Sequence, residues 1–225
     1  MGKKTKLYWT NSAESKIEAV NTDGTNKTVL FDTNLDTPLA IEVDTINGIR
    51  YLYWSNCGNT VQNIERAPLD DLSKRTQIVT GGLVYPSGIA LSVSNGKMYW
   101  CDSGTDVIEE ANLDGTERRI IANLTGHPSD IEVYKNYLYW TDWTGGIHRL
   151  DRMTGIQSIE SSDSRLIQTG PLYVGPFKVQ DDCGGCMNNG TCVSTEDDIS
   201  TCTCPNGYMG AICEIVVGYC PCALP

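Results

Sequence analysis

Short segments rich in Val, Ile, Tyr and Trp alternate with polar residues along most of the chain, and Gly, Asp, Asn and Pro separate them. Alternation of this kind is typical of half-buried strands. The pattern predicts strands at residues 7–10, 16–21, 27–30, 38–43, 51–55, 61–67, 76–79, 86–91, 97–102, 107–112, 118–122, 128–133, 137–142, 147–150 and 157–160. Helix signals are almost absent, so we expect an all-β protein.

A Tyr-Trp pair occupies the same place in four of these strands. The tyrosines Tyr8, Tyr53, Tyr99 and Tyr139 follow one another at 45, 46 and 40 residues, and the second members of the pairs are Trp9, Trp54, Trp100 and Trp140. A period of about 40–45 residues is that of a four-stranded propeller blade. Neighbouring residues of a strand point to opposite faces, so both rings are buried only where another sheet covers each face. The pairs therefore predict radially stacked sheets.

A small residue and then a short hydrogen-bond acceptor follow each pair. The acceptors are Asn11, Asn56, Asp102 and Asp142. An acceptor at the end of a strand satisfies backbone N–H groups that the strand leaves open. We expect these four residues to be hydrogen-bond partners between blades, and not catalytic groups, because a catalytic group need not recur in every blade.

The distribution of cysteine divides the chain. Cys57 and Cys101 stand alone before residue 182, whereas eight cysteines fall between Cys183 and Cys222. A short cysteine-rich module relies on disulfides, because it cannot bury a sufficient core, and this indicates an oxidising, extracellular compartment. We expect repeats at residues 1–180, a disulfide-rich module at 181–215, and a tail at 216–225 that starts another cysteine-rich module. The sequence leaves open the partners of Cys57, Cys101, Cys220 and Cys222.

The charge of the chain restricts its partners. The net charge is −11 and the isoelectric point is about 4.5. Such a field attracts basic partners, and nucleic-acid binding would require a basic stripe. No apolar run is long enough to span a membrane, and no signal peptide precedes the first strand. We therefore expect an ectodomain that reaches a membrane only through a segment outside this chain.

The Tyr-Trp strands, with Pro86-Ser87-Gly88-Ile89-Ala90 and Leu113-Asp114-Gly115-Thr116, resemble the YWTD, or class B, repeats of the low-density lipoprotein receptor family. The resemblance covers nearly residues 5–178. It implies propeller blades, four of them visible, that form part of a six-bladed ring followed by an EGF-like module. The chain would then be the C-terminal part of a longer propeller and EGF unit, and a closed four-bladed ring is the alternative.

The cysteine-rich module resembles the end of an EGF-like domain, since Cys202-Thr203-Cys204 is followed by Gly210 and Cys213 at that family's spacing. Spacing alone leaves the disulfide pairing open. The family's pairing implies disulfides Cys183–Cys192, Cys186–Cys202 and Cys204–Cys213. Sequons for N-glycosylation stand at Asn26, Asn123 and Asn189, and Thr191 matches the O-fucose pattern of EGF-like modules.

The resemblance also implies a ligand face at one end of the propeller, near its axis. Mapped onto this chain, the loops after the Tyr-Trp strands contribute, with Trp143 as an aromatic anchor. The carboxylates that would contact basic segments of secreted or matrix ligands are Glu14, Asp106, Glu109 and Glu110. The alternative for Trp143 is packing beside His148 within its own blade.

Two functions fit these features. We expect the extracellular, protein-binding region of a low-density lipoprotein receptor-related receptor, endocytic or signalling. A basement-membrane adhesion protein of nidogen type is the alternative. A propeller hydrolase is disfavoured, because the sequence shows no Ser/His/Asp or Cys/His arrangement and no metal-ligand spacing. We therefore expect neither enzymatic activity nor a cofactor or metal.

Overall fold

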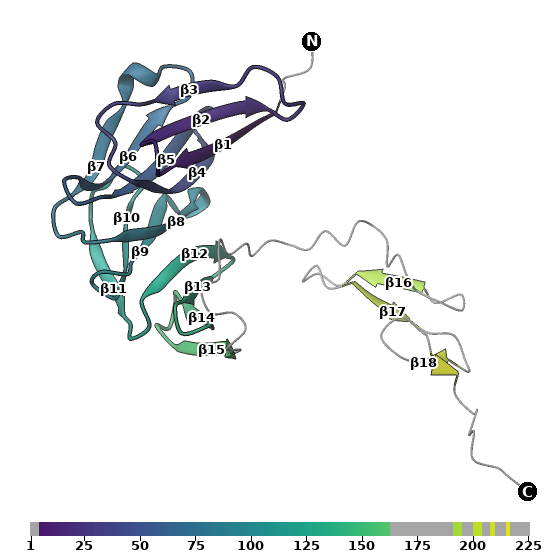
Figure 1. Ribbon diagram of the computed structural model, residues 1–225. Coiled ribbons are helices and arrows are strands. Elements are labelled where there is room, and N and C mark those ends of the chain that lie inside the picture. Colours follow the sequence, from purple (N-terminus) through teal and green to yellow (C-terminus); the bar gives the residue numbers. More distant parts are fainter. Residues whose placement is uncertain (1–4, 163–190, 195–199, 204–207, 210–214, 217–225) are drawn as a thin grey trace, which may run out of the picture. The chain divides into compact units, whose positions relative to one another are not determined.

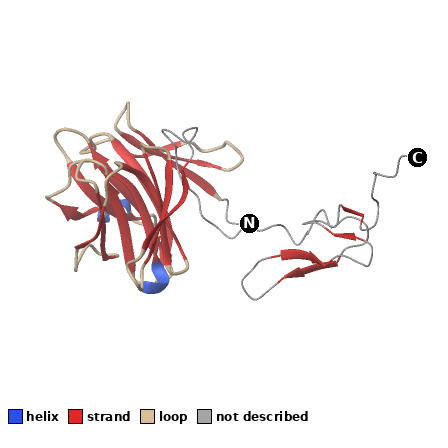
Figure 2. Ribbon diagram, turned by 90° about the horizontal axis from the view of Figure 1, so that it is seen from below, coloured by secondary structure: helices blue, strands red, loops and turns tan. Residues whose placement is uncertain are grey.

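The computed structural model describes residues 5–162, 191–194, 200–203, 208–209 and 215–216 (Figure 1). Contacts within the chain divide it into two units, Met1–Val174 and Gly175–Pro225, and each is described by itself. Strands dominate the first unit, and its described helices are two single 3-10 turns, Leu72–Lys74 and Val93–Asn95 (Figure 2). The prediction of an all-β protein is confirmed.

Residues 5–162 of the first unit form four antiparallel sheets that follow one another along the chain, and we call them blades 1 to 4. Blade 1 has three strands: β1 (Lys6–Asn11), β2 (Lys16–Asn21) and β3 (Thr28–Phe31). Blade 2 contains β4 (Pro38–Ile46), β5 (Ile49–Cys57), β6 (Gln62–Pro68) and β7 (Thr76–Thr80). Blade 3 contains β8 (Pro86–Ser92), β9 (Lys97–Asp102), β10 (Val107–Asn112) and β11 (Arg119–Asn123). Blade 4 contains β12 (Pro128–Tyr134), β13 (Tyr137–Asp142), β14 (Gly146–Asp151) and β15 (Gln157–Ser162). Each blade is a meander in chain order, as expected for propeller blades.

The second unit contains two small hairpins. Strand β16 (Thr191–Ser194) pairs with β17 (Ser200–Thr203), and β18 (Tyr208–Met209) pairs with β19 (Ile215–Val216). The register places Cys192 opposite Cys202. The residues Cys183, Cys186, Asn189, Cys204, Cys213, Cys220 and Cys222 lie outside the described residues. The EGF-like module and its disulfides therefore stay predictions.

The Tyr-Trp pairs join neighbouring blades. Tyr53 of blade 2 and Trp100 of blade 3 belong to one buried apolar cluster. Tyr99 of blade 3 and Trp140 of blade 4 belong to the next cluster. Trp54 lies in a third cluster, against which Tyr8 of blade 1 packs. Tyr8, Tyr53 and Tyr99 thus face the following blade, and Trp54, Trp100 and Trp140 face the preceding one. This confirms for Tyr53-Trp54 and Tyr99-Trp100 that the two rings occupy opposite faces.

Tyrosine hydroxyl groups add hydrogen bonds across the same joints. The Tyr53 hydroxyl donates to the carbonyl oxygen of Leu113 in blade 3, at 2.9 Å. The Tyr99 hydroxyl accepts from Nη1 of Arg152 in blade 4, also at 2.9 Å. A buried hydroxyl without a partner would be costly, so these bonds are needed wherever the tyrosine is enclosed.

On the other face of the sheet, a charged cluster covers the tryptophan. The register places Glu65 beside Trp54, and Arg75 binds both carboxylate oxygens, with Nε to Oε2 at 2.6 Å and Nη2 to Oε1 at 2.7 Å. The guanidinium lies 5.3 Å from the Trp54 ring centroid. Arg75 also donates to the carbonyl oxygens of Thr33 and Asn34, in the linker that leaves blade 1. We call this arrangement the Trp-Glu-Arg cluster.

The cluster recurs in the neighbouring blades. In blade 3, Arg118 binds Glu109, lies 5.5 Å from the Trp100 centroid and donates to the Gly81 carbonyl oxygen in the preceding linker. In blade 1, Lys27 replaces the arginine, since it pairs with Glu18 at 2.9 Å and lies 5.2 Å from the Trp9 centroid. In blade 4, His148 takes the place of the glutamate and stacks on Trp140.

We predict that Arg118→Ala destabilises the blades by about 3 kcal/mol, because it leaves the buried Glu109 carboxylate without its partner. The control is Lys74→Ala, whose side chain is 71% exposed and pairs with Asp71, itself 41% exposed; the expected loss is below about 1 kcal/mol. All five tryptophans lie in blades 1 to 4, so urea unfolding followed by tryptophan fluorescence measures the stability of both variants. Equal losses for the two variants would contradict the role of the cluster.

The first strands of blades 2 to 4 form an inner row, in which β8 contacts both β4 and β12. Gly88 lies where two of these strands meet, and a Cβ atom there would come within 2.8 Å of the Asp130 Cα atom.

Two glutamates of the inner row, Glu42 and Glu132, have raised pKa values. Burial, together with the charges of Glu132 and Asp130, raises the pKa of Glu42 to about 8. Burial also raises the pKa of Glu132 to about 7.

The raised pKa values of Glu42 and Glu132 predict that the free energy of unfolding falls as the pH rises. The folded chain retains their protons above pH 4.5, the ordinary glutamate pKa, where the unfolded chain has already released them. Stability therefore declines from about pH 5 to about pH 8. Glu42→Gln should reduce the difference between thermal midpoints measured at pH 5.5 and pH 8.5. An unchanged difference would show that Glu42 is not the titrating group.

Candidate functional site

Loops from three blades and one linker between blades line an open cavity of about 540 Å³. Three of these loops follow the Tyr-Trp strands β5, β9 and β13, as the sequence predicted for a ligand face. The linker before β8 contributes Leu83, Val84 and Tyr85. The side chains that line the cavity include Cys57, Asn59, Gln62, Leu83, Tyr85 and Trp143.

Trp143 is the most exposed tryptophan of the described chain, with 53% of its surface accessible. It follows the last residue of β13, and its backbone N–H donates to the Gly126 carbonyl oxygen at 3.0 Å. Its ring contacts the His127 ring, with centroids 5.3 Å apart. The alternative of packing beside His148 is wrong, because the His148 ring stacks on Trp140 inside the blade. Trp143 therefore remains free to contact a partner.

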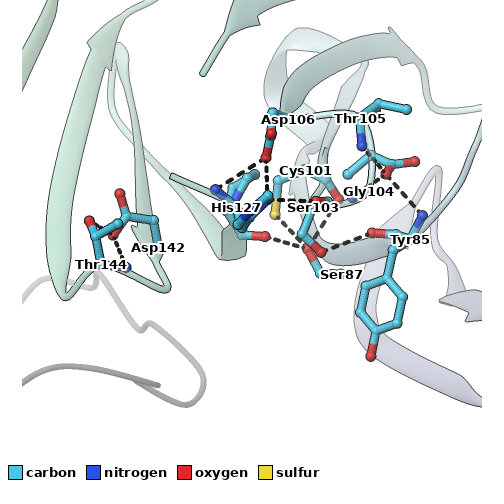
Figure 3. A network of polar contacts seen from close by, with 12 residues as sticks. Tyr85, Ser87, Cys101, Ser103, Gly104, Thr105, Asp106, His127, Asp142 and Thr144 are labelled. Carbon is cyan, nitrogen blue, oxygen red and sulfur yellow. Dashed lines mark hydrogen bonds and ion pairs between the residues drawn. The ribbon is translucent and has the colours of Figure 1, made fainter. Parts of the chain in front are cut away.

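An Asp–His pair holds the loops beside Trp143. Asp106 Oδ1 lies 2.8 Å from Nδ1 of His127 and accepts the His127 backbone N–H at 3.1 Å (Figure 3). The carbonyl oxygen of Ser103 lies 3.2 Å from the same ring nitrogen. Asp106 and His127 both have left-handed backbone conformations, with φ values of 56° and 50°, respectively. Such conformations are unfavourable for residues other than glycine, so the contacts must stabilise them.

The predicted ligand carboxylates occupy different environments. Asp106 lies in the cavity-lining loop region beside His127, and Glu14 lies exposed in the equivalent loop of blade 1, paired with Lys16. Glu109 and Glu110 lie in strand β10, where both are buried and bound to Arg118 and Arg119. The structure thus brings Asp106 and Trp143 together, whereas the carboxylates of Glu109 and Glu110 are occupied within blade 3.

The acceptor after each Tyr-Trp pair binds backbone N–H groups in all four blades. Asp102 accepts from Val84 and Tyr85, in the linker before β8, at 2.8 and 2.9 Å. Asn56 likewise accepts from Asp36, in the linker that leaves blade 1, at 3.3 Å. These two contacts join blades as predicted.

The other two acceptors bind their own loops. For Asp142 the prediction of a contact between blades is wrong, whereas for Asn11 it stays a prediction, because residues 1–4 before β1 lie outside the described residues. Asn11 Oδ1 accepts from the Glu14 N–H at 3.1 Å, within the loop after β1. Asp142 Oδ1 accepts from the N–H groups of Thr144 and Gly146, and Oδ2 binds Nε2 of His148 at 2.7 Å. Burial acts to raise the pKa of Asp142, but these hydrogen bonds outweigh it and hold that pKa below its usual value.

The structure settles the state of two cysteines. Cys57 and Cys101 are free and buried, and they do not pair with each other. The Cys101 sulfur lies 3.3 Å from the Ser87 hydroxyl, which donates to the Pro128 carbonyl oxygen in blade 4. Burial raises the pKa of the Cys101 thiol to about 12 and also raises the pKa of Cys57. A thiol in such surroundings is unreactive.

We predict that native chain treated with iodoacetamide at pH 8 leaves Cys101 unmodified, because the thiolate is both disfavoured and inaccessible. After unfolding in urea without reductant, both Cys57 and Cys101 should become alkylated. Peptide mapping by mass spectrometry measures each site separately. Rapid native labelling of Cys101, or recovery of a Cys57–Cys101 disulfide, would contradict the structure.

Several important residues were not found from the sequence. Tyr85 and the two cluster arginines, Arg75 and Arg118, carry no motif of their own. One signal was present, since a glutamate on the strand after each Tyr-Trp pair and a basic residue beyond it recur in blades 1 to 3. The basic residue could have been found by aligning the repeats, although its stacking on the tryptophan could not.

Three further observations concern the glycosylation sites, metal binding and membrane crossing. The sequon residues Asn26 and Asn123 are exposed, and Thr191 lies in β16. Within residues 5–162 and the described hairpins, no three His, Cys, Asp or Glu side chains are grouped as metal ligands. In the same residues, no helix has the length and apolar character that crossing a bilayer requires.

Comparison with known proteins identifies the repeats. The family model of the low-density lipoprotein receptor repeat class B matches residues 5–45 and 96–134. The vitellogenin receptor Yl of Drosophila melanogaster is 27% identical over 252 residues, which cover 89% of this chain and 12% of that protein. The human low-density lipoprotein receptor-related protein 5-like protein is 33% identical over 138 residues, which cover 61% of this chain and 53% of that protein.

A solved structure shows the same architecture. A chain of the crystal structure of a nidogen/laminin complex superimposes with a TM-score of 0.62 and 29% identity, over 68% of this chain and 57% of that one. The chain spans about an eighth of the length of the vitellogenin receptor and about half of that of the receptor-related protein 5-like protein. The family model, the relatives and the superposition agree with the four blades described above. The chain therefore contains repeats that match the low-density lipoprotein receptor repeat class B, and the described repeats fold as β-propeller blades.

Proposed function

We propose that the chain is an extracellular, protein-binding region of a receptor related to the low-density lipoprotein receptor, and that the loop face around Trp143 contacts its ligand. The observation that carries this proposal is the exposed Trp143 ring beside a cavity that Tyr85 also lines. Aromatic residues in such positions are the usual anchors of protein interfaces. The family relationship supports a receptor, since two relatives are receptors or receptor-related proteins by name.

The proposed ligands are secreted or matrix proteins with basic segments. The chain carries a net charge of −11, and Asp106 lies at the edge of the cavity-lining loops. An acidic surface raises the rate at which a basic partner associates and disfavours acidic ones. We propose neither nucleic acid nor membrane lipid as a partner.

Binding is proposed in place of catalysis because the reactive groups near the cavity are already engaged. The oxygens of Asp102 accept backbone N–H groups, and those of Asp142 bind backbone N–H groups and His148. The Cys101 thiol is buried, and burial raises its pKa. A general acid, base or nucleophile needs a free position near substrate. The face therefore has the chemistry of a recognition surface.

A matrix adhesion protein is the second candidate, because the superimposed structure is that of nidogen bound to laminin. A solid-phase assay with purified laminin separates the two candidates. Saturable laminin binding that Trp143→Ala weakens would favour the matrix protein. No binding to laminin, together with uptake of the chain's ligand by a cell-surface parent, would favour the receptor.

We predict that Trp143→Ala weakens ligand binding about tenfold or more, because an aromatic anchor contributes about 2 kcal/mol. Peptides selected on the wild-type chain from a displayed library supply the probes, and their affinities are measured by biolayer interferometry. The thermal midpoint should stay unchanged, since the ring is exposed. The matched control is Ile120→Ala on β11, which removes a side chain of similar exposure elsewhere. A lowered midpoint with unchanged affinity would make Trp143 a structural residue.

A further inference from the structure

His127 has one ring nitrogen that its neighbours in the structure do not use. Its Nδ1 atom lies 2.8 Å from Asp106 Oδ1 and 3.2 Å from the carbonyl oxygen of Ser103 (Figure 3). Both neighbours are hydrogen-bond acceptors, so the proton of the neutral ring is on Nδ1 and Nε2 keeps a lone pair. Among the described residues, no group is hydrogen-bonded to this Nε2 atom. The side chain is 54% exposed, so His127 presents a hydrogen-bond acceptor to solvent.

This acceptor lies beside the exposed Trp143 ring. The two ring centroids are 5.3 Å apart, and 53% of the Trp143 surface is accessible. Backbone contacts fix their arrangement, since the Trp143 N–H donates to the carbonyl oxygens of Gly126 and His127 at 3.0 and 3.2 Å. Asp106 supplies a carboxylate on the other side of the imidazole. The surface thus combines an aromatic ring, an acceptor and a negative charge.

The blades show which group fits such a combination. Arg75 and Arg118 lie 5.3 and 5.5 Å from tryptophan ring centroids, and each donates to a glutamate and to a linker carbonyl oxygen. Lys27 lies over Trp9 in blade 1. Within residues 5–162, no arginine or lysine lies over Trp143. A guanidinium suits this open surface, because its planar group stacks on aromatic rings while its N–H groups reach acceptors.

The open nitrogen has no nucleophile to activate among the described residues. A His–Asp pair activates a hydroxyl or thiol that is hydrogen-bonded to the free ring nitrogen. The Ser103 hydroxyl donates instead to the Tyr85 carbonyl oxygen at 3.4 Å, and the Cys57 thiol donates to the Thr37 carbonyl oxygen at 3.2 Å. The arrangement therefore favours recognition of a hydrogen-bond donor.

We propose that His127 determines which side chain the loop face around Trp143 accepts. An arginine of the partner donates an N–H to His127 Nε2, and its guanidinium contacts the Trp143 ring. Asp106 is a positioning residue that holds the imidazole and balances the charge of the cation. Lysine fits less well, because its compact ammonium group holds water more strongly. This inference rests on the binding role proposed above and adds the residue type that the face recognises.

Diethyl pyrocarbonate tests the open nitrogen in the free chain, because it modifies accessible, unprotonated imidazole nitrogens. The matched control is His148, whose side chain is 18% exposed and whose Nε2 lies 2.7 Å from Asp142 Oδ2. After brief treatment, peptide mapping by mass spectrometry should show much more modification at His127 than at His148. Equal modification of the two histidines, or less at His127, would overturn the proposal, because the nitrogen would then be covered.

Binding is tested with peptides that are selected on the wild-type chain and whose affinity Trp143→Ala lowers. Citrulline keeps the N–H groups of arginine but has no charge, so replacing the peptide's arginine by citrulline should weaken binding about tenfold. His127→Asn should also weaken binding about tenfold and leave the thermal midpoint unchanged, because asparagine tolerates the left-handed backbone and still donates to Asp106. His127→Gln, whose Oε1 atom replaces the Nε2 acceptor, should retain more affinity than His127→Asn.

The charge of Asp106 is tested separately. Asp106→Asn keeps the oxygen that holds His127 but removes the charge, so it should weaken binding of the arginine peptide and leave binding of its citrulline analogue unchanged. The control Asp71→Asn removes one charge from the 3-10 turn of blade 2 and should change neither affinity. Equal losses for the two peptides would show that Asp106 has only a structural role.

The outcomes separate this proposal from the proposed function. If no selected peptide depends on Trp143, the binding role of the face fails, and the arginine proposal fails with it. If the peptides depend on Trp143 but contain no arginine, only the arginine proposal is overturned. The same holds if His127→Asn binds the peptides as well as the wild-type chain does.

Discussion

The structure depends on the burial of two adjacent aromatic residues on opposite faces of one strand. No single sheet can bury both rings, so each blade requires a neighbour on each side. The tyrosine of one blade and the tryptophan of the next share a single apolar cluster, as Tyr53 does with Trp100 and Tyr99 with Trp140. The blades are therefore stabilised by their contacts with one another, and nearest-neighbour packing of this kind is the general property of repeat proteins.

Charged groups make these contacts specific. Each Trp-Glu-Arg cluster buries a glutamate, and its arginine stacks on the tryptophan while it binds carbonyl oxygens of the preceding linker. Burying charges is expensive, and the cost is offset only when every hydrogen-bonding group has a partner. The two-pronged contact of Arg75 or Arg118 meets this requirement for both carboxylate oxygens, whereas the buried indole N–H groups of Trp54 and Trp100 have no partner among the described residues. A blade rotated or shifted along its axis would lose the linker contacts, so the cluster fixes the arrangement of successive blades.

The repeated residues are largely used by the fold, so the recognition surface that we propose consists of residues outside the repeat. Trp143, Tyr85 and the Asp106–His127 pair occur once each and gather where three loops meet. A loop can vary in sequence without disturbing the aromatic joints beneath it. The left-handed backbone at Asp106 and His127 is held by their mutual contacts, which positions the surface beside Trp143.

The sequence by itself determined the strands, the repeat and the role of the Tyr-Trp pairs, because alternation and a period of about 40–45 residues follow directly from strand and blade geometry. It also indicated Trp143 as an exposed ring. Tertiary structure decided everything that depends on which side chains meet across blades. It placed Glu109 against Arg118 inside blade 3, and it directed the oxygens of Asp142 to its own blade, whereas those of Asp102 bind both their own loop and the linker before β8. Identical positions in a repeat differ in this way because their surroundings depend on the neighbouring blade, which the local sequence does not encode.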